Sequence, residues 1–188
     1  MSRNLGCLHR LKFLFPYQII RTLYFSLIDC YFQYCSTVWM LTFPSHLRGL
    51  QIVQNKSIRI LDHFLAHPRK TEELSEIKTS FLFLDILDLQ QILHLNLGIW
   101  FLKIQHKDHF FNSMKLLVEN KHSHLSRARI KFLFPFVKIE RSRLSLRYQL
   151  PQIANKYKLF ELVSESPSLY IYKKKLKKMV LSAYSSGD

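Results

Sequence analysis

The sequence predicts a mainly α-helical protein, with a helical, bundle-like body, a small β-hairpin in a basic second half and a C-terminal amphipathic helix. Three observations favour this fold class. Apolar residues recur at spacings of three and four through much of the first 120 residues and again after residue 168. They alternate at a spacing of two only between residues 132 and 150. The chain has 188 residues, of which 48% are hydrophobic, so it can bury a substantial core.

The first predicted helix covers residues 11–28, with a break near Pro16. Tyr24 and Ile28 lie four residues apart within it, as on one face of a helix. An aromatic-rich run over residues 31–43 follows it.

The second predicted helix runs from His46 to about Leu65, with Ser45 as its N-cap. Apolar and small side chains that step by three or four predict a buried stripe, made up of Leu47, Leu50, Val53, Ser57, Ile60 and Phe64. Polar side chains form the opposite stripe, made up of Arg48, Gln51, Asn55, Arg59 and Asp62. Such a helix packs one face on a core and presents the other to water or to a partner.

The third predicted helix covers residues 81–105 and is apolar almost all round, which favours a central position. A shorter helix or loop is expected over residues 107–121. Residues 23–43 and 81–102 have the length of a membrane span, but they contain Asp29 and Asp85 among other polar residues. An acidic side chain at the bilayer centre costs roughly 2.5–3.5 kcal/mol on insertion scales. Both stretches are therefore predicted to be buried helices, and no membrane partner is expected.

The second half changes its periodicity. Phe132, Phe134 and Phe136 alternate, as do the apolar residues between 144 and 150, which predicts a β-hairpin with Pro135 on an edge strand. The chain after Pro151 is expected to be loop-like. A last helix is predicted over residues 168–183, behind Ser166 and Pro167. Residues 1–120 would form a helical region and residues 121–188 the basic hairpin and helix, as one continuous unit.

The charge distribution points to a polyanionic partner. The chain carries a formal net charge of +15. Residues 1–94 hold 10 basic and 7 acidic side chains, a net of +3, and residues 95–188 hold 18 and 6, a net of +12. Aromatic residues are interleaved with the cations, as is usual for surfaces that bind nucleic acid. The candidate contacts to RNA or DNA are Arg127, Arg129, Lys131, Arg141, Arg143, Arg147, Lys173, Lys174, Lys177 and Lys178.

Other interpretations of these cations remain open. A charge run is often only a solvated face, and an anionic membrane surface would also attract it. The lysines between residues 173 and 178 also resemble a nuclear-import patch.

Catalytic and metal motifs are scarce. The four glycines are too far apart for a phosphate-binding loop, which excludes nucleotide-binding enzymes of the Rossmann or P-loop kind. Asp85 and Asp88 would share a face of the third predicted helix, as a carboxylate pair or only as a polar seam or helix-end charge. No closed set of zinc ligands is readable, so no metal site is expected. Three cysteines without framework spacing indicate a reducing, intracellular compartment.

Several segments, in order along the chain, carry a family resemblance. They are residues 23–28 (LYFSLI), 34–39 (YCSTVW), 50–60 (LQIVQNKSIRI), 122–127 (HSHLSR), 133–135 (LFP), 145–148 (SLRY) and 170–184, which contain a lysine-rich helix ending in LSAY. Together they resemble the C-terminal part of the reverse transcriptases of non-LTR (LINE-type, jockey-like) retrotransposons. The chain departs from that pattern at residues 151–157, which lack the Trp of the family motif, and at His124, where the family has an aromatic residue.

The resemblance implies a region that follows the polymerase palm, with residues 1–120 as a thumb-like region that helps to hold template RNA and primer. The palm of that family carries a Tyr-x-Asp-Asp turn, whereas this sequence has no two adjacent aspartates. The chain alone is therefore expected to be no enzyme and to need no cofactor, because Mg²⁺ would bind only in the full-length polymerase. Its expected partners are RNA or DNA and the missing palm domain. The alternative is a truncated retroelement remnant with no independent activity.

Overall fold

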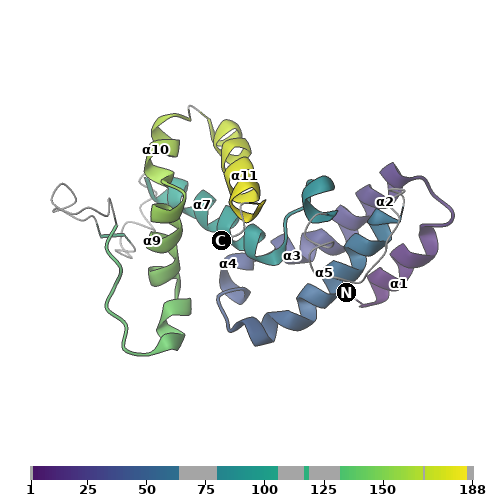
Figure 1. Cartoon of the computed structure of the whole chain (residues 1–188), viewed down its shortest axis with the longest axis horizontal. Helices are drawn as coiled ribbons and strands as arrows, with labels where there is room; N and C mark the ends of the chain where they lie inside the picture. Colours follow the sequence, from purple (N-terminus) through teal and green to yellow (C-terminus); the bar gives the residue numbers. More distant parts are fainter. Residues whose placement is uncertain (1, 64–79, 106–116, 119–131, 167, 186–188) are drawn as a thin grey trace. The chain divides into compact units, whose positions relative to one another are not determined.

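The computed structural model describes residues 2–63, 80–105, 117–118, 132–166 and 168–185 (Figure 1). Of these residues, 77% are helical and none belongs to a strand, so the mainly α-helical fold class is confirmed. The chain divides into two compact units: unit 1 comprises residues 1–36 and 44–92, and unit 2 comprises residues 37–43 and 93–188. The predicted boundary at residue 120 lies outside the described residues.

The N-terminal part of unit 1 contains two helices where one was predicted. Helix α1 spans Ser2–Leu11 and α2 spans Tyr17–Tyr24. The chain breaks at the predicted place, since Pro16 directly precedes α2 with an extended backbone. The prediction that one helix begins at residue 11 was wrong, because residues 2–11 already form a helix of their own, which buries Leu8.

Helix α2 continues into a π-helical segment and a further turn. The π-helix η1 spans Phe25–Asp29, and α3 spans Cys30–Gln33. The wider π-helical turn leaves both Ile28 and Asp29 buried. Helix α4 follows at Ser36–Trp39, after Cys35, whose backbone lies in the left-handed region at φ 48°.

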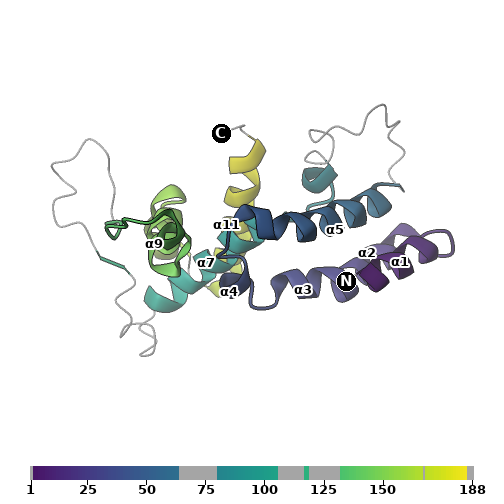
Figure 2. The same ribbon diagram turned by 90° about the horizontal axis from the view of Figure 1, so that it is seen from below.

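Helix α5 spans Pro44–Asp62 and packs against α1 and α2 (Figure 2). It begins at Pro44, so the predicted cap at Ser45 was wrong. A proline is well suited to a helix start because its φ is preset and no carbonyl needs its missing N–H. The buried residues of α5 are Gln54, Ser57, Ile58, Ile60 and Leu61. Ser57 and Ile60 of the predicted stripe are therefore confirmed as buried, its residues Leu47, Leu50 and Val53 are half-buried, and Phe64 lies outside the described residues. The buried side also takes in Gln54, a polar residue that the stripe did not include.

The predicted helix over residues 81–105 is interrupted. Residues 80–83 form one helical turn, and the backbone at Asp85 is left-handed at φ 53°. Helix α7 then spans Leu89–Gln105. Asp88 caps it: its Oδ1 accepts the N–H groups of Gln90 at 2.5 Å and Gln91 at 3.3 Å, and Gln91 Oε1 accepts the N–H of Asp88 at 2.9 Å.

The two aspartates of the predicted pair lie in different local structures. Asp85 lies in the turn and Asp88 at the helix start, so they do not share a helix face as a carboxylate pair. The interruption was hidden because apolar residues on both sides of it continue the same composition. Among the described helices, none is both long enough and apolar enough to cross a bilayer.

Unit 2 is built around an apolar core. Helices α7, α9 (Leu146–Lys156), α10 (Leu159–Ser164) and α11 (Leu169–Ser185) all contribute to it. Helix α10 contacts both α9 and α11. The core residues are Leu97, Phe101, Leu102, Phe132, Leu150, Ile153, Ala154, Tyr157, Leu159, Leu162, Tyr172, Leu176 and Val180.

The predicted β-hairpin is not present in the described residues. Glu140–Leu144 form a 3-10 helix, η2, and residues 146–156 form α9 with Pro151 inside it. The apolar residues between 144 and 150 alternate, but Leu146, Leu150 and Ala154 also step by four, and that helical period is the one that meets the core. The only β-type pairing among the described residues is an isolated bridge at Phe132.

Helix α11 agrees closely with the predicted helix over residues 168–183. Its start differs, because Ser168 rather than Ser166 offers its Oγ to a helix N–H, that of Ile171 at 3.4 Å. It packs very closely on α7: the Tyr172 hydroxyl donates to the Gly98 carbonyl at 2.8 Å, and a Cβ at residue 98 would overlap the side chain of Leu176. Only glycine therefore allows this approach without rearrangement.

Candidate nucleic-acid interface

The predicted cationic contacts that the structure describes fall into two groups in unit 2. The arginine group consists of Arg141, Arg143 and Arg147, and all three are exposed. The lysine group consists of Lys173, Lys174, Lys177 and Lys178, of which Lys177 is half-buried and the others are exposed. Arg127, Arg129 and Lys131 lie outside the described residues.

The arginine group lies on η2 and the first turn of α9. Two side-chain hydrogen bonds hold this segment in shape. Gln149 Nε2 donates to the carbonyl of Arg143 at 2.8 Å, and Ser145 Oγ donates to the carbonyl of Ser142 at 2.7 Å. Because Gln149 belongs to α9, the backbone that carries Arg143 is tied to the helix and is not a free loop.

Aromatic side chains accompany the arginine group. The rings of Phe134 and Tyr148 lie with centroids 5.5 Å apart and an angle of 35° between their planes. Phe136, two residues further along, is 87% exposed, the highest value among the large hydrophobic side chains of the described residues. Of the interleaved aromatic residues, Phe132 and Tyr157 instead belong to the core. We call Phe134, Phe136 and Tyr148 the aromatic group.

The segment that carries Phe134 and Phe136 is fastened at Phe132. Asn155 Nδ2 donates to the Phe132 carbonyl at 2.8 Å, and the Phe132 N–H donates to Asn155 Oδ1 at 3.0 Å. The Phe132 ring is buried edge-on against Phe101, with centroids 5.6 Å apart. The side-chain amide of Asn155 thus bonds both backbone polar groups of Phe132, as a neighbouring β-strand would. Sequence reasoning missed this role because the stretch after Pro151 was expected to be a loop.

The lysine group lies on the solvent side of α11. Tyr172, Leu176 and Val180 step by four along the buried side, as the amphipathic pattern predicts. Tyr170, one turn before Lys173 and Lys174, is 74% exposed.

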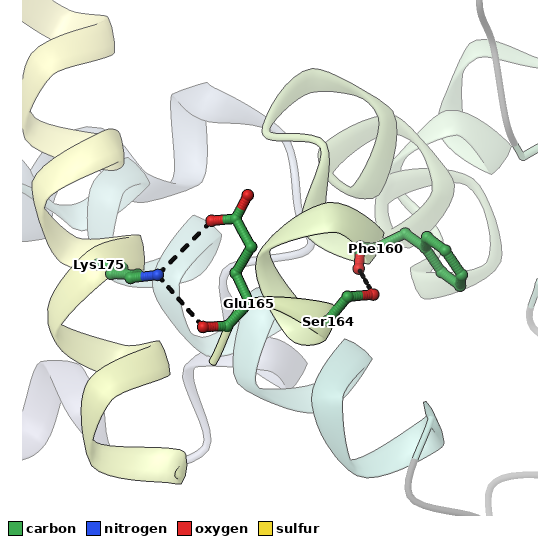
Figure 3. Close-up of polar contacts among 4 residues, drawn as sticks. All are labelled: Phe160, Ser164, Glu165 and Lys175. Atoms are coloured by element: carbon green, nitrogen blue, oxygen red, sulfur yellow. Dashed lines mark hydrogen bonds and ion pairs between the residues drawn. The ribbon is translucent and has the colours of Figure 1, made fainter. Parts of the chain in front are cut away.

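Lys175, also on α11, contacts Glu165 at the end of α10 (Figure 3). Lys175 Nζ lies 3.5 Å from a carboxylate oxygen of Glu165 and donates to the Glu165 carbonyl at 3.4 Å. Nearby, the hydroxyl of Ser164 donates to the carbonyl of Phe160 at 3.1 Å. Lys175 therefore ties α11 to the end of α10 and was not among the predicted contacts to nucleic acid.

The two cationic groups lie on different elements of unit 2. The arginine group is at the N-terminal end of α9, and α10 follows the other end of α9 (Figure 1). The lysine group begins only after α10, on α11. Each group combines exposed cations with an exposed aromatic ring, but the arginine group has more rings.

A polar pair in unit 2 joins half-buried His94 of α7 to buried Tyr157, the residue that follows α9. His94 Nδ1 and the Tyr157 hydroxyl are 3.0 Å apart, and their ring centroids 5.7 Å. Burial, and then the positive charge of Lys156, lower the pKa of His94 to about 4. Burial raises the pKa of Tyr157 to about 12. Both groups are therefore neutral at pH 7, which suits a structural contact better than proton transfer.

Unit 1 buries polar side chains at its centre. Gln54 is fully buried and its Nε2 donates to the Leu87 carbonyl at 2.9 Å, while Asp29 is 9% exposed. Burial, and then the negative charge of Asp29, raise the pKa of the buried Tyr24 hydroxyl well above its ordinary value. Across the described residues, no three His, Cys, Asp or Glu side chains gather closely enough to hold a metal ion.

Comparisons with protein-family models, with curated proteins and with solved structures found no match.

Proposed function

We propose that this chain binds nucleic acid through the cations of unit 2 and that the arginine group is the principal contact. One observation carries the proposal: three exposed arginines lie on a hydrogen-bonded segment that directly follows the exposed rings of Phe134 and Phe136 in the chain. Arginine binds phosphate bidentately, and aromatic faces stack on bases.

The electrostatics of the second half support the proposal. Residues 95–188 carry a net charge of +12, from 18 basic and 6 acidic side chains. Each phosphate that such a surface neutralises releases condensed counterions, and this entropy gain drives binding at low salt. Since α11 adds its lysine group to the arginine group, a strand that reaches both elements would gain from each.

The motif order of the sequence supports a proposed origin for this activity. We propose that the chain corresponds to the part of a non-LTR retrotransposon reverse transcriptase that follows the palm. In that setting it would hold template or primer, while the palm would supply the catalytic aspartates and the Mg²⁺ ions. The chain alone would then bind nucleic acid without extending it, and the palm domain would be its protein partner.

A salt titration of the whole chain tests the proposal. Fluorescence anisotropy with a labelled duplex should show affinity that falls as salt rises, with a log–log slope of about −0.9 per neutralised phosphate. Replacing Arg141, Arg143 and Arg147 by Ala should reduce the slope by up to about 2.7 on that scale. Arg48→Ala is the matched control, because Arg48 is an exposed arginine of α5 in unit 1. A flat slope, or no binding at low salt, would contradict the proposal.

A second candidate, a remnant without independent activity, is favoured by the surface of unit 1. Several large apolar side chains there are more than half exposed, namely Phe13 at 70%, Leu14 at 74%, Tyr31 at 52% and Tyr34 at 76%. Exposed apolar groups of this kind suit a face that once packed on another domain. A sharp, cooperative thermal transition of a monomer would count against this candidate.

A further inference from the structure

We infer that the aromatic group makes the arginine group a subsite for unpaired nucleotides, so that the chain prefers single-stranded to duplex nucleic acid. This inference rests on the proposed function and adds the class of ligand. It concerns Phe134, Phe136 and Tyr148 together with the three arginines.

The rings of Phe134 and Phe136 are unusually exposed. Phe136 is 87% exposed and Phe134 40%, although unit 2 has an apolar core that buries Phe101 and Phe132 completely or nearly so. A phenyl ring left in water forgoes roughly 1.5–3 kcal/mol of burial free energy. A base that stacks on the ring recovers part of that free energy.

The rings of Phe134 and Tyr148 are held in place before any ligand arrives. Asn155 fastens the segment at Phe132 with two hydrogen bonds of 2.8 and 3.0 Å, and Tyr148 packs on Phe134 from the first turn of α9. Gln149 fastens the arginine-bearing backbone at its other end. Binding therefore needs less ordering of the protein than a free loop would, which raises the affinity.

Basic residues are concentrated along the same segment. Between residues 132 and 147 the basic residues are Lys138, Arg141, Arg143 and Arg147, and Glu140 is the single acidic residue. The cations thus follow the aromatic residues directly in the chain. A strand whose bases lie on the rings would have its phosphates within the field of the arginines.

The choice of a single strand follows from the chemistry of the rings. Base faces in a duplex are covered by neighbouring bases, whereas unpaired bases present theirs to aromatic side chains. Phe134 and Phe136 have no hydrogen-bonding group with which to read base edges in a groove. Stacking on them is therefore expected to tolerate any base sequence.

The test compares two fluorescein-labelled probes on the full chain, an oligo(dT) of about 12 nucleotides and a hairpin duplex of about 12 base pairs. The variant Phe136→Leu keeps an apolar side chain and removes the aromatic face, and Phe136→Trp enlarges that face. Ile139→Ala is the matched control, because Ile139 is 67% exposed on the same segment and is not aromatic.

The inference expects tighter binding of oligo(dT) than of the duplex by the unmodified chain. Phe136→Leu should weaken oligo(dT) binding at least about fivefold, leave duplex binding unchanged, and keep the salt slope. Phe136→Trp should bind at least as tightly as the unmodified chain, and Ile139→Ala should bind like it.

A failure of the stacking subsite can be distinguished from a failure of the proposed function. If Phe136→Leu binds oligo(dT) normally while the triple arginine variant loses affinity for both probes, the stacking subsite is wrong and the proposed function stands. If the unmodified chain binds neither probe at low salt, the proposed function fails and the inference fails with it.

Discussion

Units 1 and 2 both bury apolar side chains, but more polar side chains are buried with them in unit 1. There Gln54 and Ser57 are fully buried beside apolar residues such as Ile58, and Asp29 is nearly so. Unit 2 has a core of apolar and aromatic side chains. A polar group within it makes a single hydrogen bond, such as the one that the Tyr172 hydroxyl donates to the Gly98 carbonyl. A buried polar group must keep its partner, whereas an apolar core depends on close packing.

The two units also differ in the side chains that they expose. Unit 1 exposes large apolar side chains between α1 and α2, including Phe13 and Leu14. Unit 2 exposes cations with aromatic rings beside them, and residues 95–188 hold most of the net charge of the chain. An apolar core can therefore support a strongly cationic surface: among the described residues of unit 2, every Lys and Arg is exposed or half-buried.

The two tryptophans allow the units to be followed separately. Trp39 and Trp100 both belong to unit 2. Tryptophan fluorescence therefore reports the unfolding of unit 2, while far-ultraviolet circular dichroism reports the helices of both units. Fluorescence therefore follows variants of unit 2, and the two signals together follow variants of unit 1.

The largest expected effect concerns the contact of α7 with α11. Leu176→Ala should lower the free energy of unfolding by about 2–5 kcal/mol, because Leu176 is fully buried. Gly98→Ala should cost about 1–3 kcal/mol, because its Cβ would overlap the Leu176 side chain. Denaturant unfolding followed by tryptophan fluorescence measures both.

The double variant supplies the control for this contact. Removing the Leu176 side chain makes room for the new Cβ, so the combined loss should be smaller than the sum of the two single losses. Strict additivity would show that Gly98 and Leu176 do not share the close approach seen here.

The next largest effect is a pH dependence located in unit 2. His94 stays neutral in the folded state down to a pKa of about 4, whereas an unfolded histidine takes up a proton near pH 6.5. Protonation therefore favours the unfolded state as the pH falls from about 6.5 toward about 4. At pH 5 the free energy of unfolding should be lower than at pH 7 by about 2 kcal/mol.

His94→Phe is the control for this pH effect, because phenylalanine keeps a ring and cannot titrate. The fluorescence-detected stability of His94→Phe should lose most of its dependence on pH between 5 and 7. An unchanged pH dependence in the variant would mean that other groups cause it.

The smallest expected effect belongs to unit 1. Gln54→Leu keeps the side-chain volume roughly constant but leaves the Leu87 carbonyl without its 2.9 Å hydrogen bond. We expect a loss of roughly 1–2 kcal/mol, visible by circular dichroism and small by tryptophan fluorescence. Gln18→Leu, at an exposed position of α2, should be nearly neutral. A larger shift of the fluorescence transition would show that the units unfold together.

Much of the helical fold was readable from the sequence. The last helix was predicted within two residues because Tyr172, Leu176 and Val180 step by four and lysines fill the remaining positions. The break at Pro16 was predicted for a local reason, the geometry of proline. The exposure of Arg141, Arg143 and Arg147 was expected from their charge and is observed.

Other features were not predictable from local pattern. The residues of α9 fit both a strand period and a helix period over residues 144–150, and only contacts with Phe132 and α7 favour the helix. The turn at Asp85 lies inside a continuous apolar run and left no compositional trace. The burial of Gln54 depends on a hydrogen bond to the backbone carbonyl of Leu87, 33 residues away.

Residue spacing and charge are local properties, so the mainly helical fold and the cationic second half could be predicted from the residues alone. The burial of Gln54, and the hydrogen bonds by which Asn155 and Gln149 hold the backbone at Phe132 and Arg143, arise only in the folded chain. A buried polar group needs a specific partner, and folding rather than adjacency along the chain brings that partner near.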